Sequence, residues 1–126
     1  MDKQELRLLL MPAFIEELRE CVGDMHRHLQ SLQQNPEQTV REMLVNEVYR
    51  AAHKMKGAAN AVEVGSIEQL CRQMQKILIT VRDGQRTIDS ELYAQFFEAI
   101  TFLMASEASL REGKDPQPSA SIFKES

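Results

Sequence analysis

Residues 43–62 read MLVNEVYRAAHKMKGAANAV, and this stretch decides the fold because its apolar positions recur with the spacing of an α-helix. The predicted helix begins near Gln38 or Thr39 and ends at about Val62. Its apolar face is formed by Met43 or Leu44, Val48, Ala51 or Ala52, Met55, Ala59 and Val62. Such a face has to be buried against other elements, which favours a fold of packed helices.

The same helix carries a polar stripe, which is predicted to face water. The stripe consists of Asn46, Arg50, His53, Lys56 or Gly57, and Asn60. Positions three and four apart share a helix face, so Lys56 and Gly57 both flank His53. A glycine inside a helix costs roughly 1 kcal/mol against alanine. One reason to keep Gly57 would be that the surface of a partner must come close to the histidine.

Two helices are predicted before this stretch. A short helix is expected from about Asp2 to Leu10, and Pro12 then suits the first turn of a second, longer helix. The apolar stripe of the longer helix is Ile15, Leu18, Val22, Met25, Leu29 and Leu32. Residues 33–36 read QQNP and are predicted to end it.

Two further helices are predicted after the stretch. Ser66, with Gln69 three residues on, is the predicted N-cap of a helix that stops around residues 83–84. The apolar face of this helix is Ile67, Leu70, Cys71, Met74, Ile77, Leu78 and Val81. The last helix is expected to open at Asp89 or Ser90 and to fade before Gly113. Its apolar positions are Leu92, Phe96, Ile100 and Leu103, with Met104 as a further candidate.

The predicted fold class is therefore all-α, an antiparallel four-helix bundle with a short extra N-terminal helix. Residues 1–112 are assigned to the bundle. Residues 113–126 are predicted to be a flexible tail or linker, because residues 115–121 read DPQPSAS and are rich in proline and serine.

Composition narrows the classes of function. The chain has 126 residues, of which 43% are hydrophobic, as expected for one domain with one core. The formal net charge of -4 leaves no basic excess to suggest nucleic acid. No apolar run approaches the ~20 residues that cross a bilayer, and the N-terminus does not resemble a signal peptide. We expect a cytoplasmic protein that is monomeric, because the apolar stripes can satisfy one another, and that binds neither nucleic acid nor membranes.

No metal or cofactor site is predicted in the chain itself. Cys21 and Cys71 fall in helical apolar patterns and are expected to be buried or half-buried thiols. His26 and His28 diverge by ~200° around a helix and do not converge on a metal. No histidine has a glutamate three residues before it, which excludes a bundle di-iron site. No phosphate-binding glycine loop, nucleophilic serine motif or kinase nucleotide motif occurs.

The segment His53-Lys54-Met55-Lys56-Gly57 resembles the H-x-(hydrophobic)-K-G signature of histidine-containing phosphotransfer (HPt) domains. The resemblance covers about residues 12–110 and includes the apolar spacing of the following helix. It implies a four-helix bundle with the motif on the second long helix. The lead-in Arg50-Ala51-Ala52 is also similar to the N-terminal phosphotransfer domain of chemotaxis-type histidine kinases.

The resemblance implies roles for individual residues. His53 would be the phosphoacceptor and Lys56 the lysine beside the phosphate. Gln75 would contact the imidazole from the next helix, at a position where chemotaxis kinases usually have a glutamate. The amide favours a phosphorelay shuttle over a chemotaxis kinase. Gly57, Lys54 and Asn60 are the predicted docking residues, although simple solvation also accounts for Lys54 and Asn60.

A second departure from the family pattern is Glu63, where the family often has glycine at the end of the active helix. Because of Glu63, the sequence does not predict the residue at which that helix ends or the charge near its end. The reacting groups are not affected.

The leading hypothesis is a phosphotransfer protein of a two-component phosphorelay. It would accept phosphate from a receiver-domain aspartate or a kinase and pass it to another receiver. The expected partners are response-regulator receiver domains, which bring Mg²⁺, and a sensor histidine kinase. Without an ATP-binding region the chain would be a phosphocarrier and not an enzyme. Two alternatives stay open: a helical interaction module that carries no phosphate, and the N-terminal domain of a chemotaxis-type kinase.

Overall fold

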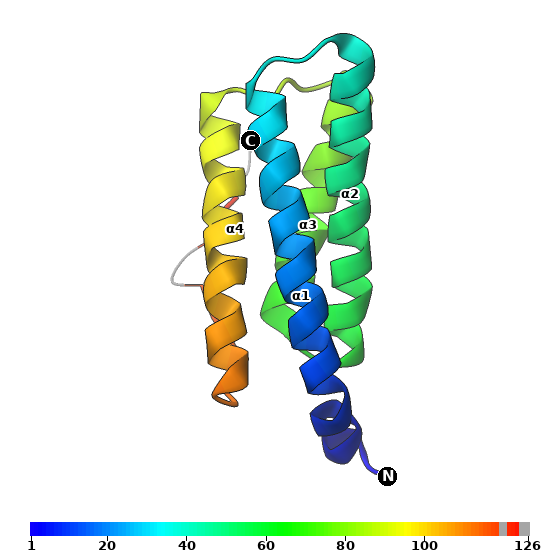
Figure 1. Cartoon of the computed structure of the whole chain (residues 1–126), viewed down its shortest axis with the longest axis vertical. Helices are drawn as coiled ribbons and strands as arrows, with labels where there is room; N and C mark the ends of the chain where they lie inside the picture. Colours follow the sequence, from blue (N-terminus) through cyan, green and yellow to red (C-terminus); the bar gives the residue numbers. More distant parts are fainter. Residues whose placement is uncertain (119–120, 124–126) are drawn as a thin grey trace.

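The computed structural model describes residues 1–118 and 121–123, and within them the chain forms four α-helices. These are α1 (Lys3–Gln33), α2 (Gln38–Ala61), α3 (Gly65–Arg82) and α4 (Ser90–Arg111). Successive helices run in opposite directions along a common axis, with short connections at the ends (Figure 1). The predicted antiparallel four-helix bundle is confirmed.

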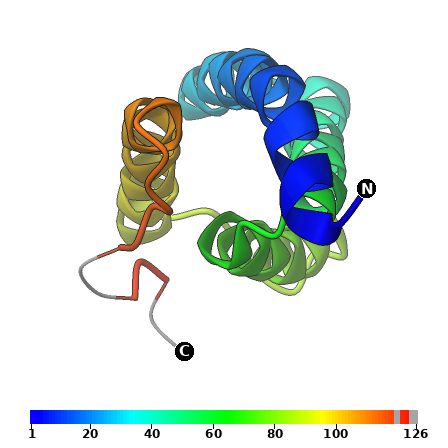
Figure 2. The same ribbon diagram turned by 90° about the horizontal axis from the view of Figure 1, so that it is seen from below.

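The core is built from the predicted apolar stripes. α2 packs most extensively on α3 and then on α1, whereas α4 rests mainly on α1 and touches α3 least. The four helices surround a common interior when the bundle is seen from its end (Figure 2). The largest fully buried side chains are Phe96, Leu18, Met25, Leu29, Leu32, Met55, Ile67, Met74, Leu78, Leu92, Ile100 and Leu103. The tight α2–α3 pair provides a rigid base for the residues of the polar stripe.

The prediction of a separate N-terminal helix is wrong, because α1 is one continuous helix with Pro12 inside it. Proline has no N–H, so the carbonyl of Leu8 loses its helical hydrogen bond. Leu8 and Leu9 are each 64% exposed, so this turn of α1 faces water. The residues before Pro12 project beyond the end of the bundle (Figure 1). Asp2 caps the helix by accepting a hydrogen bond from the N–H of Glu5 at 2.8 Å.

The start of α3 also differs from the prediction. Ser66 lies inside the first turn and is not the N-cap; that position is Val64, which makes no capping hydrogen bond. The hydroxyl of Ser66 instead donates to the carbonyl of Pro116 at 2.6 Å. The N–H of Glu68 donates to the carbonyl of Val64 at 3.1 Å, so the helical hydrogen bonds of α3 begin two residues before Ser66. Asp89, by contrast, is the N-cap of α4 and accepts from the N–H of Leu92 at 2.8 Å.

Each helix is followed by a residue with a left-handed backbone: Asn35, Glu63, Gly84 and Gly113. After α2, the N–H of Glu63 donates to the carbonyl of Asn60 at 3.1 Å, and the N–H of Val64 donates to that of Ala59 at 3.0 Å. This pair of bonds is a Schellman cap, which favours glycine at the left-handed position. Glu63, with φ 58°, therefore adopts the conformation that a glycine would take there.

Replacing Glu63 with glycine is expected to raise the free energy of unfolding by about 1 kcal/mol. A left-handed conformation costs a residue other than glycine roughly 1–2 kcal/mol, and this cost disappears in the glycine variant. Part of the gain is offset because glycine has more conformational freedom in the unfolded chain. Urea denaturation measures the difference. Glu112→Gly is the matched control, because Glu112 ends α4 with φ -87° and glycine should destabilise it there. A loss of stability in both variants would contradict the prediction.

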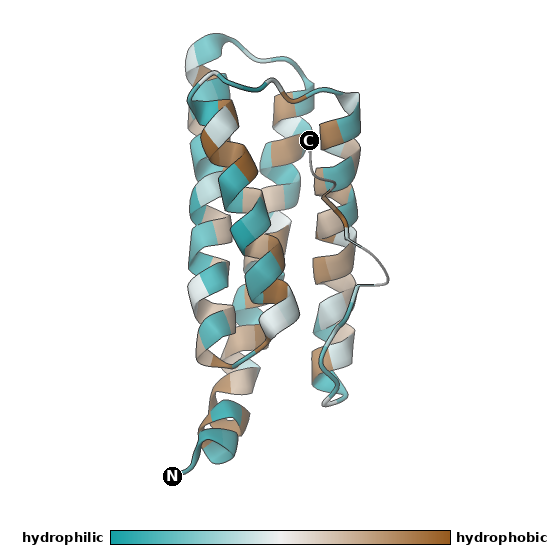
Figure 3. Ribbon diagram, turned by 180° about the vertical axis from the view of Figure 1, so that it is seen from behind, coloured by the Kyte–Doolittle hydropathy of each residue, from teal (hydrophilic) through white to brown (hydrophobic). Residues whose placement is uncertain are grey.

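The described part of the tail packs on the bundle, where the sequence analysis predicted a flexible linker. Pro116, Ile122 and Phe123 are buried. The ring of Phe123 meets Phe96 of α4 edge-on, with centroids 5.2 Å apart. Behind the bundle the chain turns back beside α4 after the helix ends (Figure 3). Residues 119–120 and 124–126 of the predicted tail lie outside the described residues.

Both cysteines are buried free thiols, as predicted. Burial raises the pKa of Cys21 to about 11; nearby Lys54 opposes the shift, and Asp24 and Glu17 add to it. Burial likewise raises the pKa of Cys71 to about 12, with a further increase from Cys21 and a decrease from Lys56. The thiols are therefore protonated near neutral pH and unsuited to nucleophilic or metal-binding roles.

At pH 8 we expect iodoacetamide to modify neither thiol until the protein unfolds. The unfolded thiols lose their protons at a pKa near 9.0, whereas the folded thiols keep theirs to higher pH. The free energy of unfolding should therefore fall as the pH rises above about 9. This fall should continue to about pH 11 for Cys21 and to about pH 12 for Cys71. Alkylation rates measured with and without urea test the first expectation. Urea denaturation of the wild type and of the double serine variant, at pH 8 and at pH 10, tests the second. Alkylation as fast in native buffer as in urea would contradict it.

Candidate functional site

His53 and Gln75 meet between α2 and α3. His53 is exposed, as predicted, whereas the side chain of Gln75 is buried and only 6% exposed. The Nε2 atom of Gln75 lies 2.9 Å from Nδ1 of His53, which is the expected contact. The antiparallel packing of α2 on α3 brings the two residues together across the connecting turn. A buried amide thus holds one nitrogen of the imidazole, and the ring itself lies at the surface.

Two residues that the sequence analysis did not single out complete the surroundings of the imidazole. The ring of Tyr49, one turn earlier on α2, stacks on that of His53 with centroids 6.4 Å apart and an interplanar angle of 12°. The guanidinium of Arg82, in the last turn of α3, lies 5.3 Å from the centroid of Tyr49. The i, i+4 spacing of Tyr49 and His53 is the one sequence signal that could have indicated the stack.

Lys56 and Gly57 lie one turn beyond His53 on α2. Lys56 is half-buried, and its positive charge lowers the pKa of the Cys71 thiol on α3. Gly57 is exposed, and a Cβ added to it would meet nothing within 4 Å. No close packing inside the described chain therefore requires a glycine. The open space beside His53 is compatible with the close approach of another molecule.

The other two predicted docking residues are engaged in contacts between helices. The ammonium of Lys54 lies 3.7 Å from a carboxylate oxygen of Glu17, on α1. The amide nitrogen of Asn60 donates to the carboxylate of Glu68, on α3, at 3.1 Å, and Arg72 donates to the same oxygen at 3.0 Å. Lys54 and Asn60 therefore tie α2 to its neighbours, one on each side of the helix.

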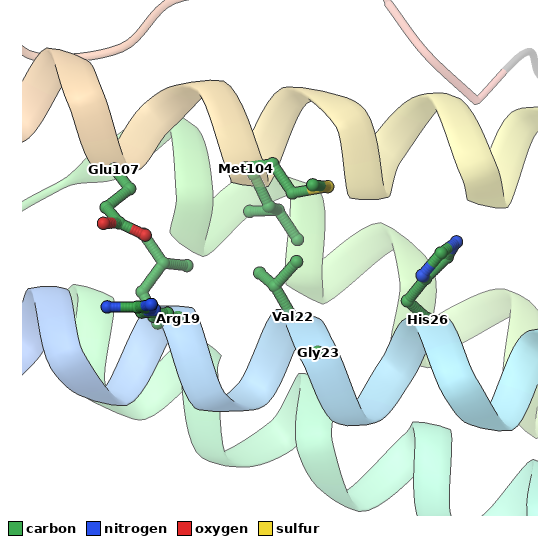
Figure 4. Close-up of a pocket in the computed structure, with 8 residues that line it drawn as sticks. Arg19, Val22, Gly23, His26, Met104 and Glu107 are labelled. Carbon is green, nitrogen blue, oxygen red and sulfur yellow. The ribbon is translucent and has the colours of Figure 1, made fainter.

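A groove between α1 and α4 is separate from the His53 site. It is lined by apolar side chains with Arg19 and Glu107 towards one end and His26 towards the other (Figure 4). None of its lining residues belongs to α2 or α3. Among the described residues, no three His, Cys, Asp or Glu side chains form a group that could hold a metal ion. In the same part of the chain, no helix combines the length and apolar character that a membrane span requires.

Comparison with known proteins points to one family. The model of the Hpt domain family matches residues 10–109. The chemotaxis protein CheA of Bacillus subtilis is 26% identical over 105 residues, which are 83% of this chain and 15% of that protein. CheA of Salmonella typhimurium is 26% identical over 103 residues, or 82% of this chain and 15% of that protein. The chain thus spans about 15% of the length of these curated relatives.

Proposed function

We propose that this chain, which belongs to the Hpt domain family and shares its histidine phosphotransfer function in two-component signalling, carries the phosphoryl group on Nε2 of His53. The observation that supports this assignment is an exposed imidazole whose Nδ1 is held by the buried amide of Gln75. The phosphoryl group comes from a receiver-domain aspartate or a histidine kinase, and it leaves for the aspartate of another receiver.

The proposed step is a direct displacement at phosphorus. The lone pair on Nε2 of neutral His53 attacks the phosphorus of an aspartyl phosphate. An N–P bond forms while the acyl O–P bond breaks, and the aspartate leaves as a carboxylate. The proton on Nδ1 stays on the ring throughout, and the reverse displacement passes the phosphoryl group to a second carboxylate. We expect the receiver to bring Mg²⁺, so that this chain supplies only position and charge.

Gln75 suits this chemistry because an amide can serve either tautomer of the imidazole. With its nitrogen towards the ring it donates to Nδ1, and the proton of the neutral imidazole then sits on Nε2. After half a turn of the amide, Oε1 accepts from Nδ1–H and the lone pair of Nε2 is free to attack. We assign the second arrangement to the reacting state. A carboxylate at this position would only accept, and so would favour that tautomer permanently.

Lys56 and Gly57 have complementary roles in the proposal. Lys56 lies one turn from His53, where its ammonium can stabilise the oxygens of the transferring phosphoryl group. Gly57 leaves room for the loops of the receiver. Lys54 and Asn60 contribute to docking mainly by holding α2 against α1 and α3, because both are already bonded to acidic residues.

Replacing Gln75 with leucine is expected to slow phosphoryl transfer about tenfold, by analogy with residues that orient metal-binding imidazoles, whose loss costs about 10- to 100-fold in affinity or activity. Gln75→Glu should retain most of the rate, because a carboxylate also accepts from Nδ1–H. Rapid-quench measurements of transfer from a phosphorylated receiver provide the rates. Gln69→Leu is the matched control on the exposed side of α3. Equal rates for the two leucine variants would exclude an orienting role for Gln75.

The direct test of the proposed function is incubation of the protein with phosphorylated receiver domains and Mg²⁺. We expect a label on the protein that is labile in acid and stable in base, as a phosphoramidate is. Receiver binding without any label, across several receivers, would instead support an interaction module that carries no phosphate.

The matches to CheA are also consistent with a second variant of the proposal, in which the chain acts as the phosphotransfer domain of a chemotaxis-type kinase, and they do not favour it over the phosphorelay shuttle. A kinase domain of that type, added with ATP, should then label this chain faster than a phosphorylated receiver does. Faster labelling by the receiver would favour the phosphorelay shuttle that Gln75 suggests.

A further inference from the structure

The imidazole of His53 is approached by α3 along two routes. The direct route is the contact with Gln75. The indirect route runs through Tyr49, whose ring stacks on His53 and lies beneath the guanidinium of Arg82. Gln75 and Arg82 are two turns apart on α3, and Tyr49 and His53 are one turn apart on α2, so the two routes reach the ring from different directions. We call the set Arg82, Tyr49 and His53 the stacking column.

We propose that Tyr49 and Arg82 are positioning residues for phosphoryl transfer: Tyr49 fixes the tilt of the His53 ring, and Arg82 fixes Tyr49. The inference rests on the phosphotransfer role proposed above. It adds to that role a second constraint on the imidazole, independent of the hydrogen bond from Gln75.

The need for a second constraint follows from the geometry of the first. A hydrogen bond to Nδ1 lies in the plane of the ring and leaves the ring free to turn about the direction of the bond. Such a turn changes where the lone pair of Nε2 points. Phosphoryl transfer requires the attacking and leaving atoms to be in line, and small misplacements of a reacting group carry large losses of rate. The nearly parallel ring of Tyr49 opposes the turn, because aromatic rings attract one another in offset stacks.

Arg82 has a matching role at the other end of the stacking column. Its guanidinium lies within the distance at which the face of an aromatic ring attracts a cation. Asp83 follows it in the chain, and one of its carboxylate oxygens lies 3.5 Å from Nε of Arg82. Tyr49 is half-buried and makes both contacts with its ring, so phenylalanine should be able to replace it.

Two measurements on each of three variants test the proposal. The rate of phosphoryl transfer from a phosphorylated receiver reports on function. The ring-proton NMR resonances of His53 in the unphosphorylated protein report on the stack, because the ring current of Tyr49 shifts them. Tyr49→Leu is expected to slow transfer about 3- to 10-fold and to move the His53 resonances, whereas Tyr49→Phe should keep both near wild type. Arg82→Gln should slow transfer about 2- to 5-fold.

The matched controls are Tyr93→Leu, which changes the other tyrosine of the chain, on α4, and Arg27→Gln, which changes an exposed arginine of α1. Neither should alter the transfer rate or the His53 resonances. Unchanged rates and resonances in Tyr49→Leu would overturn the proposal, and so would a Phe variant as impaired as the Leu variant. A wild type that accepts no phosphate would overturn the phosphotransfer role instead, while the His53 resonances would still decide whether Tyr49 positions the ring.

Discussion

Glutamine in place of His53 is expected to abolish phosphoryl labelling completely while leaving the bundle folded. The amide of glutamine can occupy part of the space of the imidazole but offers no nucleophilic nitrogen. Because the buried amide of Gln75 loses its hydrogen-bond partner, the free energy of unfolding should fall by about 1 kcal/mol, which leaves the bundle folded. Autoradiography after incubation with a labelled receiver, together with urea denaturation, measures both effects.

The chain supplies its own controls for this experiment. It contains three histidines, and the other two, His26 and His28, are half-buried residues of α1. His26→Gln and His28→Gln should both accept phosphate at the rate of the wild type. Label that survives His53→Gln, or that disappears with either of the other variants, would show that the phosphoacceptor has been wrongly assigned.

A leucine at position 57 is expected to slow phosphoryl transfer about 100-fold without destabilising the protein. An added Cβ at Gly57 meets nothing within 4 Å, so the fold should accept a side chain there, and the loss of a helix glycine should raise the free energy of unfolding by up to about 1 kcal/mol. A receiver that docks over His53 would meet the leucine and be held away from the imidazole. Displacements of about 1 Å from the reacting position can reduce a rate by about 100-fold.

Gly23 is the matched control for this prediction. It is also a helix glycine, it lies on α1, and an added Cβ there would meet only Nη1 of Arg27 at 3.9 Å, which is ordinary contact. Gly23→Ala and Gly57→Ala should both raise the stability by about 1 kcal/mol, but only the changes at Gly57 should slow transfer. Wild-type transfer by Gly57→Leu would mean that no partner surface comes close at this position.

Helical periodicity alone was enough to predict the four helices, because each has an apolar stripe that the bundle buries. The ends were harder to predict, since they depend on local hydrogen bonds. Pro12 is compatible with the first turn of a helix and also with the interior of a helix whose preceding turn is exposed. The sequence does not show that the turn before Pro12 is exposed, so it could not distinguish the two cases. The proline and serine composition of the tail hid the apolar pair Ile122 and Phe123, which packs on the bundle.

Within the site, residues on one helix were easier to predict than contacts between helices. The exposure of His53 followed from the polar stripe of α2, and the place of Gln75 followed from the family spacing. The pairing of Lys54 with Glu17 and of Asn60 with Glu68 depends on how the helices are rotated against each other, which periodicity does not specify. The same holds for Arg82, which reaches His53 only through Tyr49.

The assignment of the phosphoryl group to Nε2 of His53 is tested most directly by NMR of protein that carries ¹⁵N-labelled histidine. After phosphorylation, we expect a one-bond ¹⁵N–³¹P coupling at Nε2 of His53 and a proton retained on Nδ1, which Gln75 holds. Coupling at Nδ1 of His53, or at a nitrogen of His26 or His28, would contradict it.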